Sequence, residues 1–130
     1  MPFVQWSDSL SIGIEAIDSQ HKQLVRMLNE LSDAFESPDR ESITSSSLEK
    51  MKKYSKEHFA DEEQFMKENN YPELEDHKEK HDIFIDKVCV YDDVQLLLRA
   101  PYYDMLNFLK QWLVEHITEC DQRIATFLKQ

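Results

Sequence analysis

Apolar residues recur along this chain at steps of three and four, which is the spacing of one face of an α-helix. Four segments carry such a stripe, and we expect helices over residues of about 18–36, 41–70, 72–95 and 101–128. The charged residues between the stripe positions would then face water. The stripes comprise Ile17, His21, Leu24, Leu28, Leu31 and Phe35; Met51, Tyr54, His58, Glu62 and Phe65; Leu74, His77, His81, Phe84 and Val88; and Met105, Leu109, Trp112, Leu113, His116, Ile124 and Leu128.

Proline marks the breaks between these segments, at Pro38, Pro72 and Pro101. A proline cannot continue a helix but suits its first turn. The chain has one glycine among its 130 residues, which is too few for a fold rich in β-hairpins. The sequence therefore predicts one all-α domain over residues 1–130, with an N-terminal arm (1–17) and an antiparallel up-down-up-down four-helix bundle.

The charge balance narrows the range of partners. The formal net charge is −11, and such a surface repels nucleic-acid phosphates and anionic membranes. No apolar run approaches the roughly 20 residues of a membrane span, and the N-terminus does not resemble a signal peptide. Cys89 and Cys120 lie in no CxxC motif, so we expect reduced thiols and a cytoplasmic protein.

All five histidines lie on the apolar stripes. In an antiparallel bundle, residues equally far from a shared loop lie at one height, because each residue adds about 1.5 Å of rise. By that rule the histidines of all four helices and Glu62 fall in one layer, and Asp121 falls slightly past it. A single histidine on an apolar face is more often a hydrogen-bonded core residue than a metal ligand. Five in one layer beside a carboxylate would be costly to bury without partners, so we interpret the layer as a metal site.

The number of donors predicts two metal ions. Five imidazoles and two carboxylates exceed the four ligands that one tetrahedral zinc ion needs, and no cysteine is placed to help. Seven ligands suit two ions with the carboxylates bridging them. Nitrogen and oxygen donors in a bundle core favour iron, with manganese as the alternative.

The residues around these donors resemble a known family. The motifs are "QHKQL" with His21, "HFADEEQFM" with His58 and Glu62, "YPELEDHKEKHDIF" with His77 and His81, and "WLVEHITECD" with His116 and Asp121. Together with "WSDSLSIGIEAIDSQH" in the arm, they resemble the hemerythrin family in its single-domain bacterial form. The resemblance spans nearly the whole chain.

The resemblance implies a non-haem di-iron centre that binds O2 reversibly. His77, His81 and His116 would bind one iron, and His21 and His58 the other, with Glu62 and Asp121 as bridges. An oxo or hydroxo bridge would complete six ligands at the first iron and leave one open position for O2 at the second.

Several residues are candidates for an O2 pocket. Leu24, Phe59, Trp112 and Leu113 lie within a few residues of a ligand, and each could equally be ordinary bundle core. Thr118 stands where members of the family usually have Leu or Met, and we expect it near the pocket unless its hydroxyl bonds a backbone carbonyl one turn back. Cys120 precedes Asp121, and an inert core thiol is the favoured interpretation over a redox role.

The leading functional prediction is an O2 carrier or store rather than an enzyme. No histidine follows a glutamate by three residues, as it does in the ExxH motifs of di-iron proteins rich in carboxylates. One alternative is a sensor of iron, O2 or redox state, although 130 residues leave no room for an output domain. Another is a di-iron enzyme handling peroxide or nitric oxide, with Tyr54 as its only evident acid or base. The expected partners are O2 and an oxygen-consuming enzyme, and we expect a monomer.

Overall fold

The computed structural model describes residues 3–93 and 99–129, with side chains described outside 92–100. The helices are α1 (Glu15–Ala34), α2 (Arg40–Glu68), α3 (Leu74–Asp93), α4 (Arg99–Glu115) and α5 (Gln122–Leu128). Six residues of π-helix, η2 (His116–Asp121), join α4 to α5, and a short 3₁₀ turn, η1 (Asp8–Leu10), lies in the arm. The described part of the chain holds no strand.

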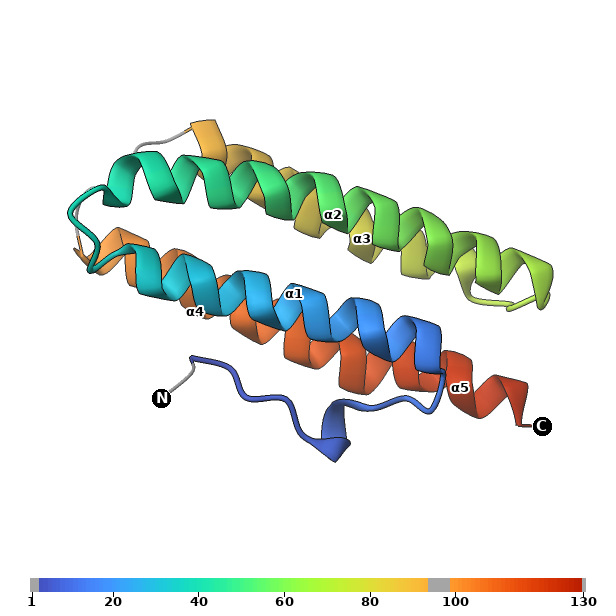
Figure 1. The fold of residues 1–130 in the computed structure, drawn as a ribbon. Coiled ribbons are helices and arrows are strands. Elements are labelled where there is room, and N and C mark those ends of the chain that lie inside the picture. The colour runs from blue at the N-terminus through green and yellow to red at the C-terminus, as the bar shows by residue number, and fades with distance from the viewer. Residues whose placement is uncertain (1–2, 94–98, 130) are drawn as a thin grey trace.

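The helices form the expected antiparallel four-helix bundle (Figure 1). Helix α1 lies beside α4 on one side of the bundle, and α2 lies beside α3 on the other (Figure 1). Helix α2 also packs against α1, and α3 against α4, which closes the bundle around one core. The all-α prediction is therefore confirmed. None of the described helices combines the length and the apolar character needed to traverse a membrane.

The helix boundaries differ from the predicted ones by a few residues. Helix α1 begins at Glu15 rather than near residue 18, because Asp18 stabilises the entry to the helix by accepting a hydrogen bond from the Ile12 amide at 2.9 Å. The predicted end of the third helix, at residue 95, lies outside the described residues. The predicted fourth helix is divided by η2.

The turn between α2 and α3 has a defined geometry. Asn70 adopts a left-handed backbone conformation with φ of 56° just after the end of α2. The Asn70 amide donates to the Lys67 carbonyl at 3.2 Å, and the Tyr71 amide donates to the Met66 carbonyl at 2.9 Å. This is the hydrogen-bond pattern of a Schellman motif, and Met66 and Tyr71 pack together beneath it. The motif fixes where α3 starts and hence the heights of His77 and His81.

The N-terminal arm is attached to the outer side of α1 and α4 (Figure 1). Asn29 on α1 accepts a hydrogen bond from the Val4 amide at 2.7 Å and donates one to the Val4 carbonyl at 2.8 Å. Three apolar side chains of the arm, Val4, Leu10 and Ile12, are buried in the main core. The arm therefore completes the hydrophobic core as well as leading into α1.

The α2 stripe is corrected by the structure at two positions. Ser55 and Met66 are fully buried, whereas Tyr54 and Phe65 are only half-buried. The rotation of α2 against its neighbours, which spacing within one helix does not determine, decides which of two adjacent residues is buried at each of these positions. The histidine and the glutamate between these positions remain buried.

Candidate metal centre

The five histidines, Glu62 and Asp121 meet in the interior of the bundle. His21 comes from α1, His58 and Glu62 from α2, His77 and His81 from α3, and His116 and Asp121 from the two ends of η2. None of the seven side chains belongs to a residue that is more than 5% exposed. All four helical segments therefore contribute to one enclosed cluster of nitrogen and oxygen donors.

Three histidines gather on one side of the carboxylates, and we call His77, His81 and His116 the three-histidine group. The Nε2 atom of His77 lies 2.7 Å from Glu62 Oε1 and 2.9 Å from Asp121 Oδ1. His81 Nε2 lies 3.1 Å from the same Glu62 oxygen, and His116 Nε2 lies 3.2 Å from the same Asp121 oxygen. The Nε2 atoms of His81 and His116 are 3.1 Å apart. Three nitrogens and two carboxylate oxygens thus converge on one point.

His21 and His58 face the other oxygens of the same carboxylates, and we call them the two-histidine group. His21 Nε2 lies 3.0 Å from Asp121 Oδ2 and 3.7 Å from Glu62 Oε2. His58 Nε2 lies 3.4 Å from Glu62 Oε2. Each carboxylate therefore presents one oxygen to each histidine group.

The π-helical segment η2 brings Asp121 into this layer. In an α-helix, residues five apart are separated by about 140° around the axis, so His116 and Asp121 could not share a face. The i→i+5 pattern of a π-helix places them together, and such segments recur at functional sites. Asp121 is 0% exposed and contacts both groups. The expectation that it lies past the layer is wrong, because it assumed a regular α-helix.

Two side chains outside the cluster hold histidine rings by their outer nitrogens. Glu63 Oε2 lies 2.8 Å from His81 Nδ1, and Gln20 Oε1 lies 2.6 Å from His58 Nδ1. The Gln20 amide nitrogen donates to Asp61 at 3.0 Å, which turns the amide oxygen towards the histidine. Because a carboxylate and an amide oxygen can only accept, each Nδ1 carries the proton and each Nε2 lone pair faces the centre. Sequence reasoning missed both residues, although each directly adjoins a candidate ligand in the chain.

The two histidines of the two-histidine group have pKa values shifted in opposite directions. Burial would lower the pKa of His21, but the carboxylates of Asp121 and Glu62 outweigh it and raise that pKa to about 9. Burial dominates at His58 and lowers its pKa to about 4. The same carboxylates raise the pKa of His77 and His116 against the effect of burial. Without a metal ion, protons on imidazoles therefore balance the two buried carboxylates.

The donor set fits metal ions. Four buried atoms that face the centre, His21 Nε2, Glu62 Oε2 and both oxygens of Asp121, have no well-aligned hydrogen-bond partner among the described residues. Unpaired buried polar atoms are costly, and a metal ion would pair them. Two ligand atoms at right angles and about 2.1 Å from one ion are about 3.0 Å apart, close to the separations found here. Both groups also have their ligand atoms within 4.8 Å of one another, as a shared ion requires.

Aromatic rings lie flat against the three-histidine group. The Phe59 ring stacks on His81 with centroids 3.9 Å apart, and the Trp112 ring stacks on His116 with centroids 4.4 Å apart. One turn away is a small cavity with apolar walls, and we call it the apolar cavity. Its lining comprises Leu24, Leu28, Met51, Phe84, Leu109 and Leu113.

Of the five residues expected near an O2 pocket, four lie beside the cluster or the apolar cavity, and Thr118 does not. Thr118 is exposed, and its hydroxyl donates to the Val114 carbonyl one turn back at 2.8 Å. The expectation for Thr118 is wrong, because two residues of helix rotate it away from His116. Tyr54, the candidate acid or base, is half-buried, and its pKa is raised by burial and by the charges of Asp61 and Glu57. It makes no hydrogen bond to a cluster residue within the described chain.

Comparison with known proteins gives one consistent result. Residues 12–128 match the family model described as the hemerythrin HHE cation binding domain. A bacteriohemerythrin of Stenotrophomonas maltophilia is 35% identical over 99% of this chain and 84% of its own length. A myohemerythrin of Theromyzon tessulatum is 33% identical over 90% of this chain and 87% of its own length. A crystal structure of wild-type hemerythrin superposes with a TM-score of 0.82 at 26% identity, covering 98% of this chain and 99% of that one.

Proposed function

The chain belongs to the hemerythrin family, whose members bind O2 at non-haem iron, and on this premise we propose that it binds O2 reversibly at a pair of iron ions. The observation that carries the proposal is that each of the two carboxylates has one oxygen near each histidine group. One oxygen of Glu62 and one of Asp121 face the three-histidine group, and the other two oxygens face the two-histidine group. That arrangement suits two ions joined by two bridging carboxylates.

The ligand assignment follows from the two groups. His77, His81 and His116 would hold one ion, and His21 and His58 the other. With one oxygen of each carboxylate, the first ion would have five protein ligands and the second would have four. When bound, the iron pair supplies two electrons and one open position, which is what reversible O2 binding requires. The open position would lie on the two-histidine side, because that group has one imidazole fewer.

The surrounding side chains would protect bound O2 from water. Phe59 and Trp112 cover two of the imidazoles, and the leucines of the apolar cavity extend this dry wall towards Leu24, one turn after His21. Release of the bound O2 as peroxide needs protons, so keeping water away slows that release. Gln20 and Glu63 contribute by fixing the orientation of His58 and His81.

Storage or delivery of O2 is the role we propose for this binding. Members of the family are generally O2-binding proteins rather than enzymes. Within the described chain, Tyr54 makes no hydrogen bond to a cluster residue, and Asp61 and Glu57 are the charges that act on its pKa. An oxygen-consuming enzyme as the recipient, a cytoplasmic setting and a monomeric state stay predictions.

Visible spectra taken through one cycle of O2 exposure test the proposed function. The reduced protein should be nearly colourless without O2, gain a charge-transfer band on exposure to air, and lose that band when O2 is removed. Glu62→Ala is the matched control, because it removes a proposed bridge and should show no such cycle. A band that fails to appear in the iron-loaded protein, or that cannot be reversed, would contradict reversible binding.

A further inference from the structure

The enclosure of the cluster raises the question of how iron reaches it. None of the seven cluster residues is more than 5% exposed. A divalent cation is strongly hydrated, and removing that water without replacement ligands is costly. The apolar cavity suits O2 but offers a cation nothing to bind. A route for iron needs polar side chains that extend from solvent to one of the ligands.

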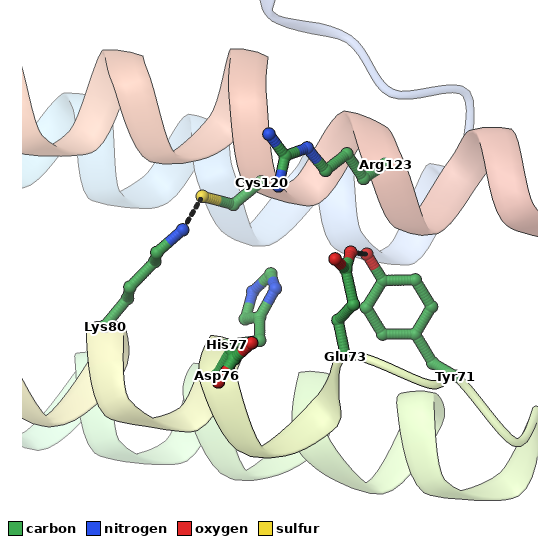
Figure 2. Close-up of a pocket in the computed structure, with 7 residues that line it drawn as sticks. All are labelled: Tyr71, Glu73, Asp76, His77, Lys80, Cys120 and Arg123. Atoms are coloured by element: carbon green, nitrogen blue, oxygen red, sulfur yellow. Dashed lines mark hydrogen bonds between the residues drawn. The ribbon is translucent and has the colours of Figure 1, made fainter.

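A polar pocket of about 60 Å³ lies beside the three-histidine group, and we call it the outer pocket (Figure 2). This space holds about two water molecules. It opens between the start of α3 and the segment from η2 to α5 (Figure 2). The side chains that matter for its chemistry are Glu73, Asp76, His77, Lys80, Cys120 and Arg123.

His77 connects the outer pocket to the cluster. It is 4% exposed, and its Nε2 atom faces Glu62 and Asp121 inside the cluster. The other ring nitrogen, Nδ1, points away from the cluster and makes no hydrogen bond to any residue that the structure describes. Nδ1 of His58 and of His81, by contrast, is held by Gln20 and Glu63. His21 Nδ1 also lacks a partner among the described residues, but His21 is buried away from the outer pocket, so His77 is the ring whose unheld nitrogen lies at this pocket.

The charged groups around His77 act in opposite directions. Glu73 lies in the turn just before α3 and Asp76 in the first turn of α3, and their carboxylates would attract a cation. Glu73 is held in place by a hydrogen bond from the Tyr71 hydroxyl at 3.0 Å. Lys80, one turn further along α3, donates to Cys120 Sγ at 3.3 Å and so spans the pocket (Figure 2). Its positive charge, together with that of Arg123 in the same lining, would oppose an entering cation.

We propose that the outer pocket is the port through which Fe²⁺ enters and leaves the cluster, with Glu73 and Asp76 attracting the ion, His77 passing it inward and Lys80 restraining the passage. This inference rests on the proposed iron centre. The port residues other than His77 are not ligands of the final site. They therefore change the rates of loading and release by similar factors and leave the final iron content unchanged.

The rate of iron release from the reduced, iron-loaded protein tests the port. The protein is mixed with an excess of a coloured ferrous chelator, and the appearance of the chelate is followed over time. The test variant is Glu73→Gln with Asp76→Asn, and the matched control is Glu75→Gln with Glu79→Gln. The control removes the same charge from exposed positions of α3 that do not line the pocket.

Removing the port carboxylates should slow release by about threefold to tenfold, because each carboxylate lowers the energy of a passing cation. The control pair should change the rate by less than about twofold, since neither Glu75 nor Glu79 lines the pocket. Lys80→Gln should speed release by about threefold, because it removes an opposing charge.

Equal rates in the port variant and the control would overturn the proposal and indicate release by a general opening of the bundle. A slower release from Lys80→Gln would also overturn it, because the pocket would then favour anions. Iron content measured before mixing separates the two proposals. Absence of iron from the wild-type protein contradicts the iron centre, whereas full iron with unchanged release rates contradicts only the port.

Discussion

The two histidine groups share both carboxylates yet differ in what lies behind them. The three-histidine group is supported by the charged Glu63 and adjoins the polar outer pocket through His77. The two-histidine group is supported by the neutral amide of Gln20. In the proposed iron centre, this difference would let one half hold an ion firmly and the other leave a position for a ligand. Five variants, one control variant and one pH series test the comparison, in order of decreasing effect.

Loss of a shared carboxylate should affect both halves, whereas loss of one histidine should affect one. Glu62→Ala removes the oxygens that face His77 and His21, so we expect less than about half an iron ion per chain. His77→Ala removes one nitrogen of three, and about one ion should remain. Iron analysis with protein quantification measures both. Equal iron contents in the two variants would contradict the bridging role of Glu62.

The two-histidine group should make iron binding depend on pH. The folded-state pKa of His21 is raised from 6.5 to about 9. Its protonation therefore stabilises the metal-free protein fully below pH 6.5, and that stability is lost as the pH rises through about 9. The loss from this one group is roughly 3 kcal/mol. Iron takes the place of the proton, so the difference in Tm between iron-loaded and metal-free protein should grow from pH 6.5 to 9.

His58, in the same group, makes the stability of the metal-free protein depend on pH in the direction opposite to His21. Its pKa is lowered to about 4, so the stability it provides is present above pH 6.5 and is lost as the pH falls towards 4. The metal-free protein should therefore have its highest Tm near pH 6.5, measured by circular dichroism in buffers of equal ionic strength. A Tm that rises steadily up to pH 9 would show that His21 does not carry a proton in the metal-free fold.

Replacing Glu63 by glutamine should give His81 the same kind of neutral hydrogen-bond partner that His58 has in Gln20. Glu63→Gln keeps a hydrogen-bond acceptor near His81 Nδ1 but removes its charge, as Gln20 does at His58. Outer partners of this kind typically change metal affinity by about tenfold to a hundredfold. We expect iron affinity to fall by about tenfold, measured by competition with a chelator. Gln64→Ala, an exposed neighbour, is the control. An unchanged affinity would show that Glu63 only occupies space.

The smallest effect is expected at Thr118. Because it is exposed and bonded to the Val114 carbonyl, Thr118→Leu should leave the rate of autoxidation within about twofold of wild type. Leu113→Thr places a hydroxyl in the wall of the apolar cavity and should increase that rate several-fold. The decay of the O2-dependent visible band measures both. A large effect of Thr118→Leu would require this side chain to reach the cluster.

Much of the bundle and the cluster could be predicted because helical spacing converts directly into direction and height. The steps of three and four placed the histidines and Glu62 in the interior, and the loop positions placed them in one layer. The π-helical segment could not be predicted from spacing, since it interrupts the 3.6-residue period of the α-helix. A spacing of five between His116 and Asp121 was its only trace in the sequence.

The residues behind the ligands were harder to predict for a different reason. Gln20 reaches His58 across the contact between α1 and α2, and Glu63 reaches His81 across the contact between α2 and α3. Such contacts depend on how the helices are rotated against each other, and spacing within one helix does not determine that rotation. The same reason accounts for the exchange of Tyr54 for Ser55 on the buried face of α2.

The number of metal ions per chain tests the central claim most directly. Protein produced with ample iron would be analysed by native mass spectrometry and by elemental analysis of the same sample. The division of Glu62 and Asp121 between the two histidine groups predicts about two iron ions per chain, lost together at acid pH. A single tightly bound zinc ion with no iron would contradict the account.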